Sequence, residues 1–122
     1  MECVIVDTSS IIFGISNSID VFEKISEMLP GCVMLISNGV QRELKGIGLG
    51  KGRNSKYARI SLELIGKKKL TVRRDDGNVD AWILKETASG KCAVCTNDTK
   101  LRRSLRQNGA KVLTLGMDGR LR

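Results

Sequence analysis

The chain has 122 residues, a formal net charge of +8 and no histidine. This length allows one hydrophobic core, so we expect residues 1–122 to form a single domain. Without histidine, Ser-His-Asp catalysis, Cys-His catalysis and histidine-ligated zinc are excluded. Aromatic residues make up only 3% of the chain, which argues against nucleic-acid binding through base-stacking platforms.

Charge is distributed unevenly along the chain. Residues 1–41 hold one base and five acids, whereas residues 42–122 hold twenty bases and eight acids. A strongly basic segment is typical of domains that bind a polyanion such as nucleic acid, although it also serves solubility. No apolar run reaches the roughly 20 residues needed to cross a membrane. No basic segment precedes the first apolar run, so we expect no signal peptide and a cytoplasmic location.

The first half of the chain alternates apolar runs with helical patterns. Cys3–Val6 is a short continuous apolar run, typical of a strand that is covered on both faces. Helices are expected at Ser9–Ile15 and Asp20–Leu29, because apolar residues recur there at helical spacing. Cys32–Ile36 is expected to be a second strand, and Ser37 to cap the helix that follows it.

A glycine-rich basic segment, residues 46–56 (GIGLGKGRNSK), follows that helix. Its glycines would let the backbone approach a phosphate closely, but a flexible surface loop explains them equally well. It lacks the spacing of a Walker P-loop. A longer helix is expected next, with Tyr57, Ile60, Leu64 and Ile65 facing inward.

The second half repeats the alternation. Strands are expected at Leu70–Val72, Cys92–Thr96 and Val112–Leu115, and helices at Asn78–Ala88 and Asp98–Gln107. Alternating β and α segments indicate a parallel sheet with helices on both faces. In such sheets the ligand site lies beyond the carboxyl ends of the strands.

The four cysteines include a C-x-x-C pair, Cys92 and Cys95. Three residues apart on a strand, these side chains point to opposite faces and cannot share a metal ion. Cys3 and Cys32 also lie at the starts of apolar strands. We therefore interpret all four cysteines as buried, inert thiols.

Two acidic residues follow strands of the expected sheet. Asp7 comes directly after the first strand and Asp98 shortly after the fourth, so both would emerge at the same edge. Each could instead be a helix N-cap, a role for which Asn97 competes with Asp98.

Two more acids, Glu43 and Asp80, lie on helices that start at this edge. Asp80 could simply interact with a helix dipole, and Glu43 could pair with Lys45 or Lys51. Four carboxylates meeting at one edge would repel one another unless a cation joined them. All-oxygen sites suit Mg²⁺ or Mn²⁺, which are also compatible with phosphate.

The segments VDTSSII, SNGVQREL, NVDAWIL and CTNDTKLRRSL resemble the PIN-domain nucleases over nearly the whole chain. The resemblance implies a three-layer α/β/α sandwich with a five-stranded parallel sheet in the order 3-2-1-4-5. It also implies a catalytic set that binds Mg²⁺ or Mn²⁺, and two small residues that support it. The acids that match the family's metal-binding acids are Asp7, Glu43, Asp80 and Asp98, and the supporting residues are Ser9 and Thr96.

The chain departs from the family pattern at two positions. Lys100 stands where many relatives have a further acid, and Ala81 stands where relatives often have another. A second metal ion is therefore expected to be held weakly or not at all.

The resemblance implies an endoribonuclease that hydrolyses RNA to leave a 5′-phosphate and a 3′-hydroxyl. IVDTSSIIFGISNSIDVFE, ELKGIG and TNDTKLRRSLR are most similar to the branch that acts in small-subunit ribosomal RNA maturation. The alternatives are a toxin ribonuclease of a toxin–antitoxin pair and a non-catalytic RNA-binding factor for ribosome assembly. A phospho-acceptor receiver domain would need an acid closing the third strand, but Arg73 follows Val72 there.

Basic residues near the expected site are candidates for RNA contacts. Arg102, Arg103 and Arg106 would share one face of a helix. Further possible partners are a second copy of the chain, forming a homodimer, and ribosome-assembly proteins. The complete candidate set is Lys45, Lys51, Arg53, Lys56, Lys100, Arg102, Arg103 and Arg106.

Overall fold

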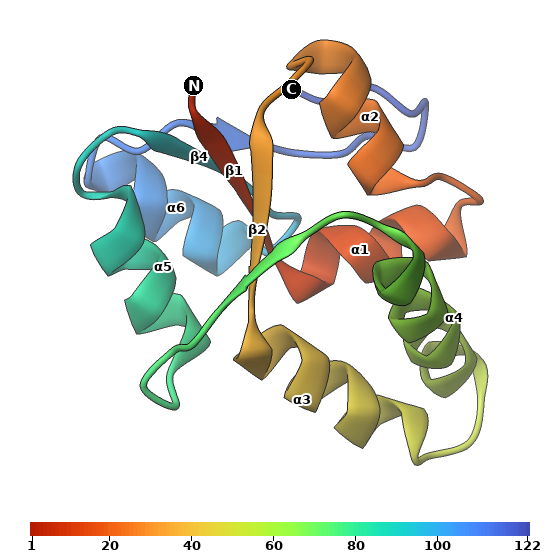
Figure 1. Cartoon of the computed structure of the whole chain (residues 1–122). Coiled ribbons are helices and arrows are strands. Elements are labelled where there is room, and N and C mark those ends of the chain that lie inside the picture. The colour runs from red at the N-terminus through yellow and green to blue at the C-terminus, as the bar shows by residue number, and fades with distance from the viewer.

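The computed structural model describes residues 1–122 and has a five-stranded sheet at its centre. The strands are β1 (Cys3–Val6), β2 (Val33–Ser37), β3 (Thr71–Arg73), β4 (Cys92–Cys95) and β5 (Val112–Leu113). They lie in the order β3-β2-β1-β4-β5, and all neighbouring pairs are parallel (Figure 1). The expected order is confirmed. Parallel strands place all their carboxyl ends at one edge of the sheet.

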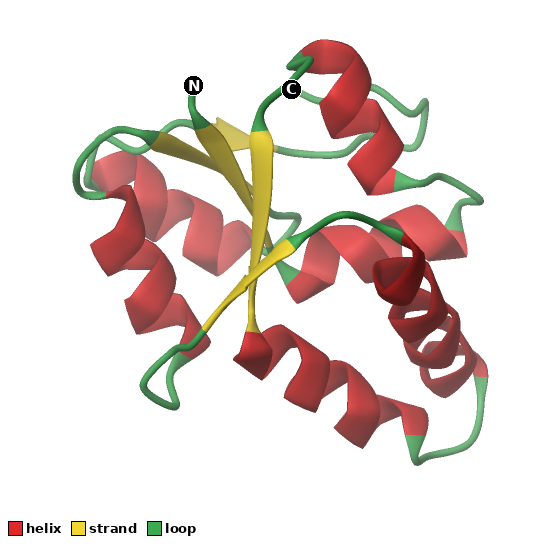
Figure 2. Cartoon of the chain, viewed as in Figure 1, coloured by secondary structure: helices red, strands yellow, loops and turns green.

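Six helices cover the two faces of the sheet. They are α1 (Thr8–Ser16), α2 (Val21–Met28), α3 (Asn38–Gly48), α4 (Arg53–Lys67), α5 (Val79–Thr87) and α6 (Thr99–Gln107). The helices α1 to α4 lie on one side of the sheet, and α5 and α6 lie on the other (Figures 1 and 2). The expected three-layer α/β/α sandwich is confirmed.

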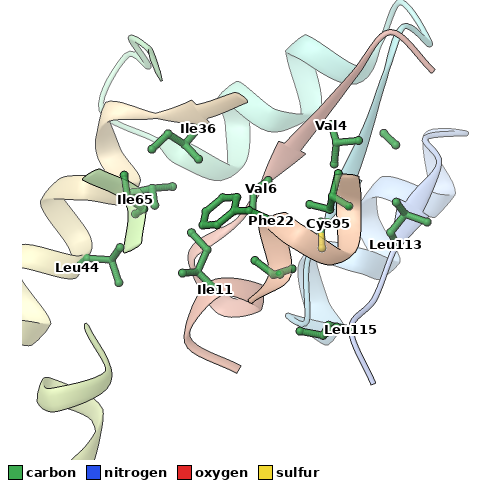
Figure 3. Close-up of a cluster of buried hydrophobic side chains, with 14 of the residues drawn as sticks. Val4, Val6, Ile11, Phe22, Ile36, Leu44, Ile65, Cys95, Leu113 and Leu115 are labelled. Atoms are coloured by element: carbon green, nitrogen blue, oxygen red, sulfur yellow. The ribbon is translucent and has the colours of Figure 1, made fainter. Parts of the chain in front are cut away.

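Side chains of the central strands alternate between two apolar clusters. Val4 and Val6 belong to the larger cluster, whereas Ile5 belongs to the smaller one beneath α5 and α6. Figure 3 shows part of the larger cluster, in which Phe22 of α2 and Ile11 of α1 are fully buried. Both faces of β1 are therefore covered, which explains its continuous apolar sequence.

The expected inward stripe of the long helix is confirmed for Ile65 and in part for Leu64, but it is wrong for Ile60. Ile60 is exposed in α4, and the buried positions include Ser55, Ala58 and Ser61 together with Ile65. Helix α4 makes extensive contacts with α3, and small side chains let two helices approach closely. Small residues as well as apolar ones therefore make up the buried face of α4.

The glycine-rich segment is mostly helical rather than a loop. Gly46 and Gly48 lie in the last turn of α3, and Arg53–Lys56 form the first turn of α4, so only residues 49–52 join the two helices. Arg59 donates a hydrogen bond to the carbonyl of Gly48 across 2.7 Å. Gly52 has φ +100°, a conformation that favours glycine, at the N-cap of α4.

The interpretation of all four cysteines as inert thiols is wrong for two of them. Cys3 and Cys92 are partners in the β1–β4 register and form a disulfide, with their Cα atoms 4.5 Å apart. Cys95 is a buried free thiol on the opposite face, as the strand geometry predicted, and burial raises its pKa to about 12. Cys32 is also free, but it is only half-buried.

Strand β5 is shorter than expected. It ends at Leu113, and Leu115 instead pairs antiparallel with Leu121 of the C-terminal segment. No helix has both the length and the apolarity that a membrane span requires.

Candidate active site

A pocket of about 300 Å³ opens at the carboxyl edge of the sheet. Asp7 follows β1 and Asp98 is the N-cap of α6, while Glu43 and Asp80 come from α3 and α5. All four predicted carboxylates thus line one pocket. Its apolar walls are formed by Ile12, Ile47 and Val79.

Asp7 is the buried carboxylate of this pocket, only 7% exposed. Its Oδ2 accepts hydrogen bonds from Ser9 Oγ at 2.7 Å and from Thr96 Oγ1 at 2.8 Å. Asp7 stands at the N-cap position of α1, but its side chain makes no capping hydrogen bond to the helix. Two hydroxyl donors therefore satisfy the buried charge without neutralising it.

The same two hydroxyls shape the loop that carries Asp98. Thr96 Oγ1 accepts from the amide of Asp98 at 3.1 Å, and Ser9 Oγ accepts from the amide of Asn97 at 3.0 Å. Asp98 caps α6 through Oδ1, which accepts from the Leu101 amide at 3.0 Å. The capping role predicted as an alternative is thus real for Asp98, and it holds the carboxylate at the pocket.

Asn97 does not compete for that cap. Its amide group instead bonds the backbone of Leu115 in both directions, at 2.9 and 3.2 Å. The loop after β4 is therefore anchored to the segment after β5.

Glu43 is held by a residue that the sequence analysis did not identify. Thr8 Oγ1 donates a 3.0 Å hydrogen bond to Glu43 Oε2, and no ion pair joins Glu43 to Lys45 or Lys51. Partial burial raises the pKa of Glu43, the bond from Thr8 opposes this, and the other three pocket carboxylates raise it further. The only signal for Thr8 in the sequence is its place directly after Asp7.

Asp80 lies in the first turn of α5, where Asn78 provides the helix cap. Partial burial raises the pKa of Asp80, and the charges of Asp7 and Asp98 add to this effect. The positive charge of Lys100 lowers the pKa of Asp80 and so partly offsets the effect of the neighbouring acids.

The donor chemistry of the pocket fits a divalent cation. No three acidic or cysteine side chains lie in positions that would together hold a metal ion as they stand. The pocket nevertheless offers oxygen donors of the type that Mg²⁺ and Mn²⁺ prefer. Burial raises the pKa values of Glu43 and Asp80, and a bound cation would relieve the repulsion that adds to this effect.

The predicted basic residues fall into three places. Arg102, Arg103 and Arg106 line a second hollow of about 440 Å³ with Thr99 and Gln107, on the outer face of α6. Lys100 is about 160° from Arg102 around the helix axis and lies on the side of Asp80. The remaining four surround the α3–α4 connection and are exposed: Lys45, Lys51, Arg53 and Lys56.

None of these eight basic residues has a carboxylate within 4.0 Å. Arg102 donates to Thr114 Oγ1 at 3.2 Å, which fixes its side chain beside β5. These positive charges are therefore free to meet an anion.

Known proteins match this chain over nearly its whole sequence. It is 27% identical to Ribonuclease VapC9 of Archaeoglobus fulgidus, over 99% of this chain and 88% of the relative. A solved structure described as the PIN domain endonuclease Utp24 superposes with a TM-score of 0.80 at 25% identity. That match covers 98% of this chain and 90% of the other.

A domain of a functionally unknown protein from Methanocaldococcus jannaschii shares the fold. Its TM-score is 0.60 at 20% identity, covering 95% of this chain and 92% of that one. The family model described as "PIN like domain" matches residues 4–117. This match spans nearly the whole sheet and all four pocket acids, and the chain belongs to the PIN-like domain family.

Proposed function

We propose that residues 1–122 act as one metal-dependent endoribonuclease domain. The observation that carries this proposal is the meeting of Asp7, Glu43, Asp80 and Asp98 in one pocket, where no base pairs with them. Uncompensated acids destabilise a fold unless they serve a ligand, so their collection at one edge points to a cation site.

Each pocket residue has a role in this proposal. Asp7, Asp80 and Asp98 would hold Mg²⁺ or Mn²⁺, which when bound lowers the pKa of water and neutralises phosphate charge. Ser9 and Thr96 orient Asp7 through their hydrogen bonds. Glu43 would orient the attacking water, and its raised pKa makes it a better proton acceptor than an ordinary glutamate.

RNA is the substrate that the surface charge supports. The eight unpaired cations would contact phosphates, and the outer face of α6 offers three arginines together. With so few aromatic residues, binding would depend on phosphate and shape more than on base stacking.

Two biological settings have support. The sequence motifs favour ribosomal RNA maturation, and the TM-score of 0.80 to the PIN domain endonuclease Utp24 supports an endonuclease. The 27% identity to Ribonuclease VapC9 supports a ribonuclease, the class of enzyme to which the toxin alternative also belongs. Expression that arrests growth unless a neighbouring small gene is present would favour the toxin, whereas cleavage confined to ribosomal RNA precursors would favour maturation.

The central experiment compares cleavage of structured ribosomal RNA and transfer RNA with and without Mn²⁺. We expect Asp7→Asn and Asp98→Asn to abolish cleavage while circular dichroism shows a folded protein. Glu86→Gln, an exposed acid-to-amide change on α5, is the matched control and should cleave normally. Full activity of both aspartate variants, or full activity in EDTA, would reject the mechanism. No cleavage by the wild type would leave a non-catalytic RNA-binding factor.

RNA contact is tested separately from chemistry. For single-stranded RNA, replacing Arg102, Arg103 and Arg106 by alanine should lower the slope of log affinity against log salt by about 2, since each phosphate contact contributes roughly 0.7. Replacing Arg120 and Arg122, which pair with Asp118, should leave the slope unchanged. Equal slopes for the triple variant and the wild type would remove the α6 face from the RNA path.

A further inference from the structure

Asp75 lies between β3 and α5, and its carboxylate has no exposed area. Three donors form hydrogen bonds with it, and the side chain of Ser37 also stabilises its charge. Oδ2 accepts from the Gly39 amide at 2.9 Å, and Oδ1 accepts from the Gly77 amide at 2.7 Å and from Arg42 Nη2 at 3.1 Å. Burial opposes ionisation, but these hydrogen bonds prevail and lower the pKa of Asp75. Unlike the pocket acids, Asp75 is thus fully satisfied by the protein, and it does not line the pocket.

Asp75 and the first turn of α3 exchange two hydrogen bonds, one donated from each side. The amide of Asp75 donates to Asn38 Oδ1 at 3.1 Å, while its carboxylate accepts from Gly39. Asn38 and Gly39 form the first turn of α3, whose free amides favour a negative charge. Two segments separated by 36 residues are therefore joined at the carboxyl edge of the sheet.

Only glycine fits at residue 39. A Cβ there would overlap Asp75 Oδ2 and lie 2.5 Å from Cγ2 of Val79. Val79 is the first residue of α5 and precedes Asp80 in the pocket wall. The absence of a side chain at Gly39 thus lets the first turns of α3 and α5 meet.

These contacts bear on two of the pocket acids. Glu43 lies one helical turn after Gly39, and Asp80 lies five residues after Asp75. Glu43 and Asp80 carry like charges and have no direct bond to each other, so their own interaction would push the two helix starts apart. A separate tie is needed to keep both carboxylates at one pocket.

We propose that Asp75 is a positioning residue, which ties the first turn of α3 to the segment entering α5 and so sets the separation of Glu43 and Asp80. This role rests on the proposed metal-dependent function. Asp75 acts through its contacts with the backbone of Gly39 and the side chain of Arg42, and it touches neither metal nor RNA.

The first test is Asp75→Asn. The asparagine side chain has the size of the carboxylate. Its NH₂ group, however, is a donor and would face another donor where an oxygen of Asp75 now accepts a hydrogen bond. We expect Mn²⁺ affinity without RNA, measured by electron paramagnetic resonance of free Mn²⁺, to fall about tenfold or more, the usual cost of losing a partner behind a metal ligand. Asp76→Asn changes the exposed neighbour, which makes no hydrogen bond through its side chain, and should bind Mn²⁺ like the wild type.

The second test approaches the same contact from the other side. Gly39→Ala places a methyl group against Asp75 and should lower Mn²⁺ affinity in the same way. Both changes break the same contact between Asp75 and Gly39. The double variant should therefore bind Mn²⁺ about as tightly as the single variant with the lower affinity. If either variant fails to fold, Arg42→Ala, which removes one donor from Asp75, should still weaken Mn²⁺ binding several-fold.

Cleavage against Mn²⁺ concentration separates positioning from general destabilisation. We expect the folded variants to need more Mn²⁺ for half-maximal rate and to approach the wild-type rate at saturating Mn²⁺. Folded variants with wild-type Mn²⁺ affinity would overturn the role of Asp75 and leave the nuclease proposal standing. A wild type that neither binds Mn²⁺ nor cleaves RNA would overturn both.

Discussion

The two walls of the acidic pocket are built in different ways. The inner wall, formed by Asp7 and Ser9 with the buried Thr96 behind them, follows the central strands, and both hydroxyls donate to Asp7, at 2.7 and 2.8 Å. The outer wall, formed by Glu43 and Asp80, comes from two helix turns and has no bond between its members. Burial and mutual repulsion raise the pKa values of both outer acids.

This difference separates a fixed part of the site from an adjustable part. The sheet register and two hydroxyl donors determine where Asp7 lies, whatever the pocket contains. The positions of Glu43 and Asp80 depend on how α3 and α5 are held, and a cation would draw them inward. We therefore expect inner-wall changes to cost stability and activity together, and outer-wall changes to affect mainly metal binding.

Among changes that leave all four carboxylates in place, the largest effect on cleavage should come from Thr96→Val, which keeps the shape of the side chain but removes the inner wall's shared hydroxyl. Asp7 loses a charge-assisted hydrogen bond and the amide of Asp98 loses its acceptor. We expect the free energy of unfolding to fall by about 1.5–3 kcal/mol. Cleavage should fall roughly 10–100-fold. Urea denaturation and cleavage rates measure both, with Thr71→Val on the exposed β3 as control. Unchanged stability would mean that the inner wall is not fixed by this network.

Next in size is the pH dependence of metal binding. Glu43 and Asp80 must lose their protons to bind Mn²⁺, and their pKa values are raised above the ordinary 4.5 and 3.8. Affinity should therefore begin to fall while the pH is still above 4.5, by up to about tenfold per pH unit for each protonated ligand. Mn²⁺ titrations across this range test it. An affinity that stays level down to pH 4.5 would contradict the raised pKa of Glu43.

Glu43→Gln should stabilise the metal-free protein slightly, in contrast to the loss of stability expected for Thr96→Val. A carboxylate with a raised folded-state pKa destabilises the fold above that pKa, so its removal should stabilise the protein at neutral pH. Because Glu43 is largely exposed, solvent screening limits the gain to a few tenths of a kcal/mol. The melting temperature should rise by about 1–2 °C.

The same stabilisation should disappear below the ordinary pKa of 4.5, where Glu43 is protonated in both the folded and the unfolded protein. Glu63→Gln, an exposed change on α4, is the control and should shift the melting temperature at neither pH. A lower melting temperature for Glu43→Gln at neutral pH would contradict the repulsion and show that the hydrogen bond from Thr8 outweighs it.

The smallest effect on cleavage is expected at the opposite end of β1 and β4. Cys3→Ser removes a disulfide that closes a loop of 89 residues, which should lower the free energy of unfolding by about 2–4 kcal/mol. The amino ends of the strands lie away from the pocket, so the cleavage rate of the folded variant should match the wild type. Reducing the disulfide of the wild-type protein should lower its stability to that of the Cys3→Ser variant. A folded variant without activity would show that the pocket depends on both ends of the strands.

Much of this arrangement could be predicted from the sequence. Short apolar runs indicate strands buried on both faces, and their alternation with helical patterns indicates a parallel sheet. Once the strands are placed, Asp7 and Asp98 must emerge at one edge. The strand order itself came from the resemblance to PIN-domain nucleases, because local patterns say little about which strands are neighbours.

The features that could not be predicted depend on distances between remote segments. The pairing of Cys3 with Cys92 requires the β1–β4 register, and the burial of Ser61 in place of Ile60 requires the close approach of α4 to neighbouring helices. The contact of Asp75 with Gly39 joins two helix starts across 36 residues. No local pattern encodes such contacts, since each becomes visible only after the whole chain has folded.

The central place of β1 has a consequence for biosynthesis. Asp7 leaves the ribosome early, yet its partner Thr96 follows 89 positions later, and β4 must insert beside β1 before the two can meet. Contacts between such distant parts of a chain form late and slowly. A growing polypeptide therefore cannot assemble the acidic pocket until β4 and Thr96 have been translated and β4 has paired with β1.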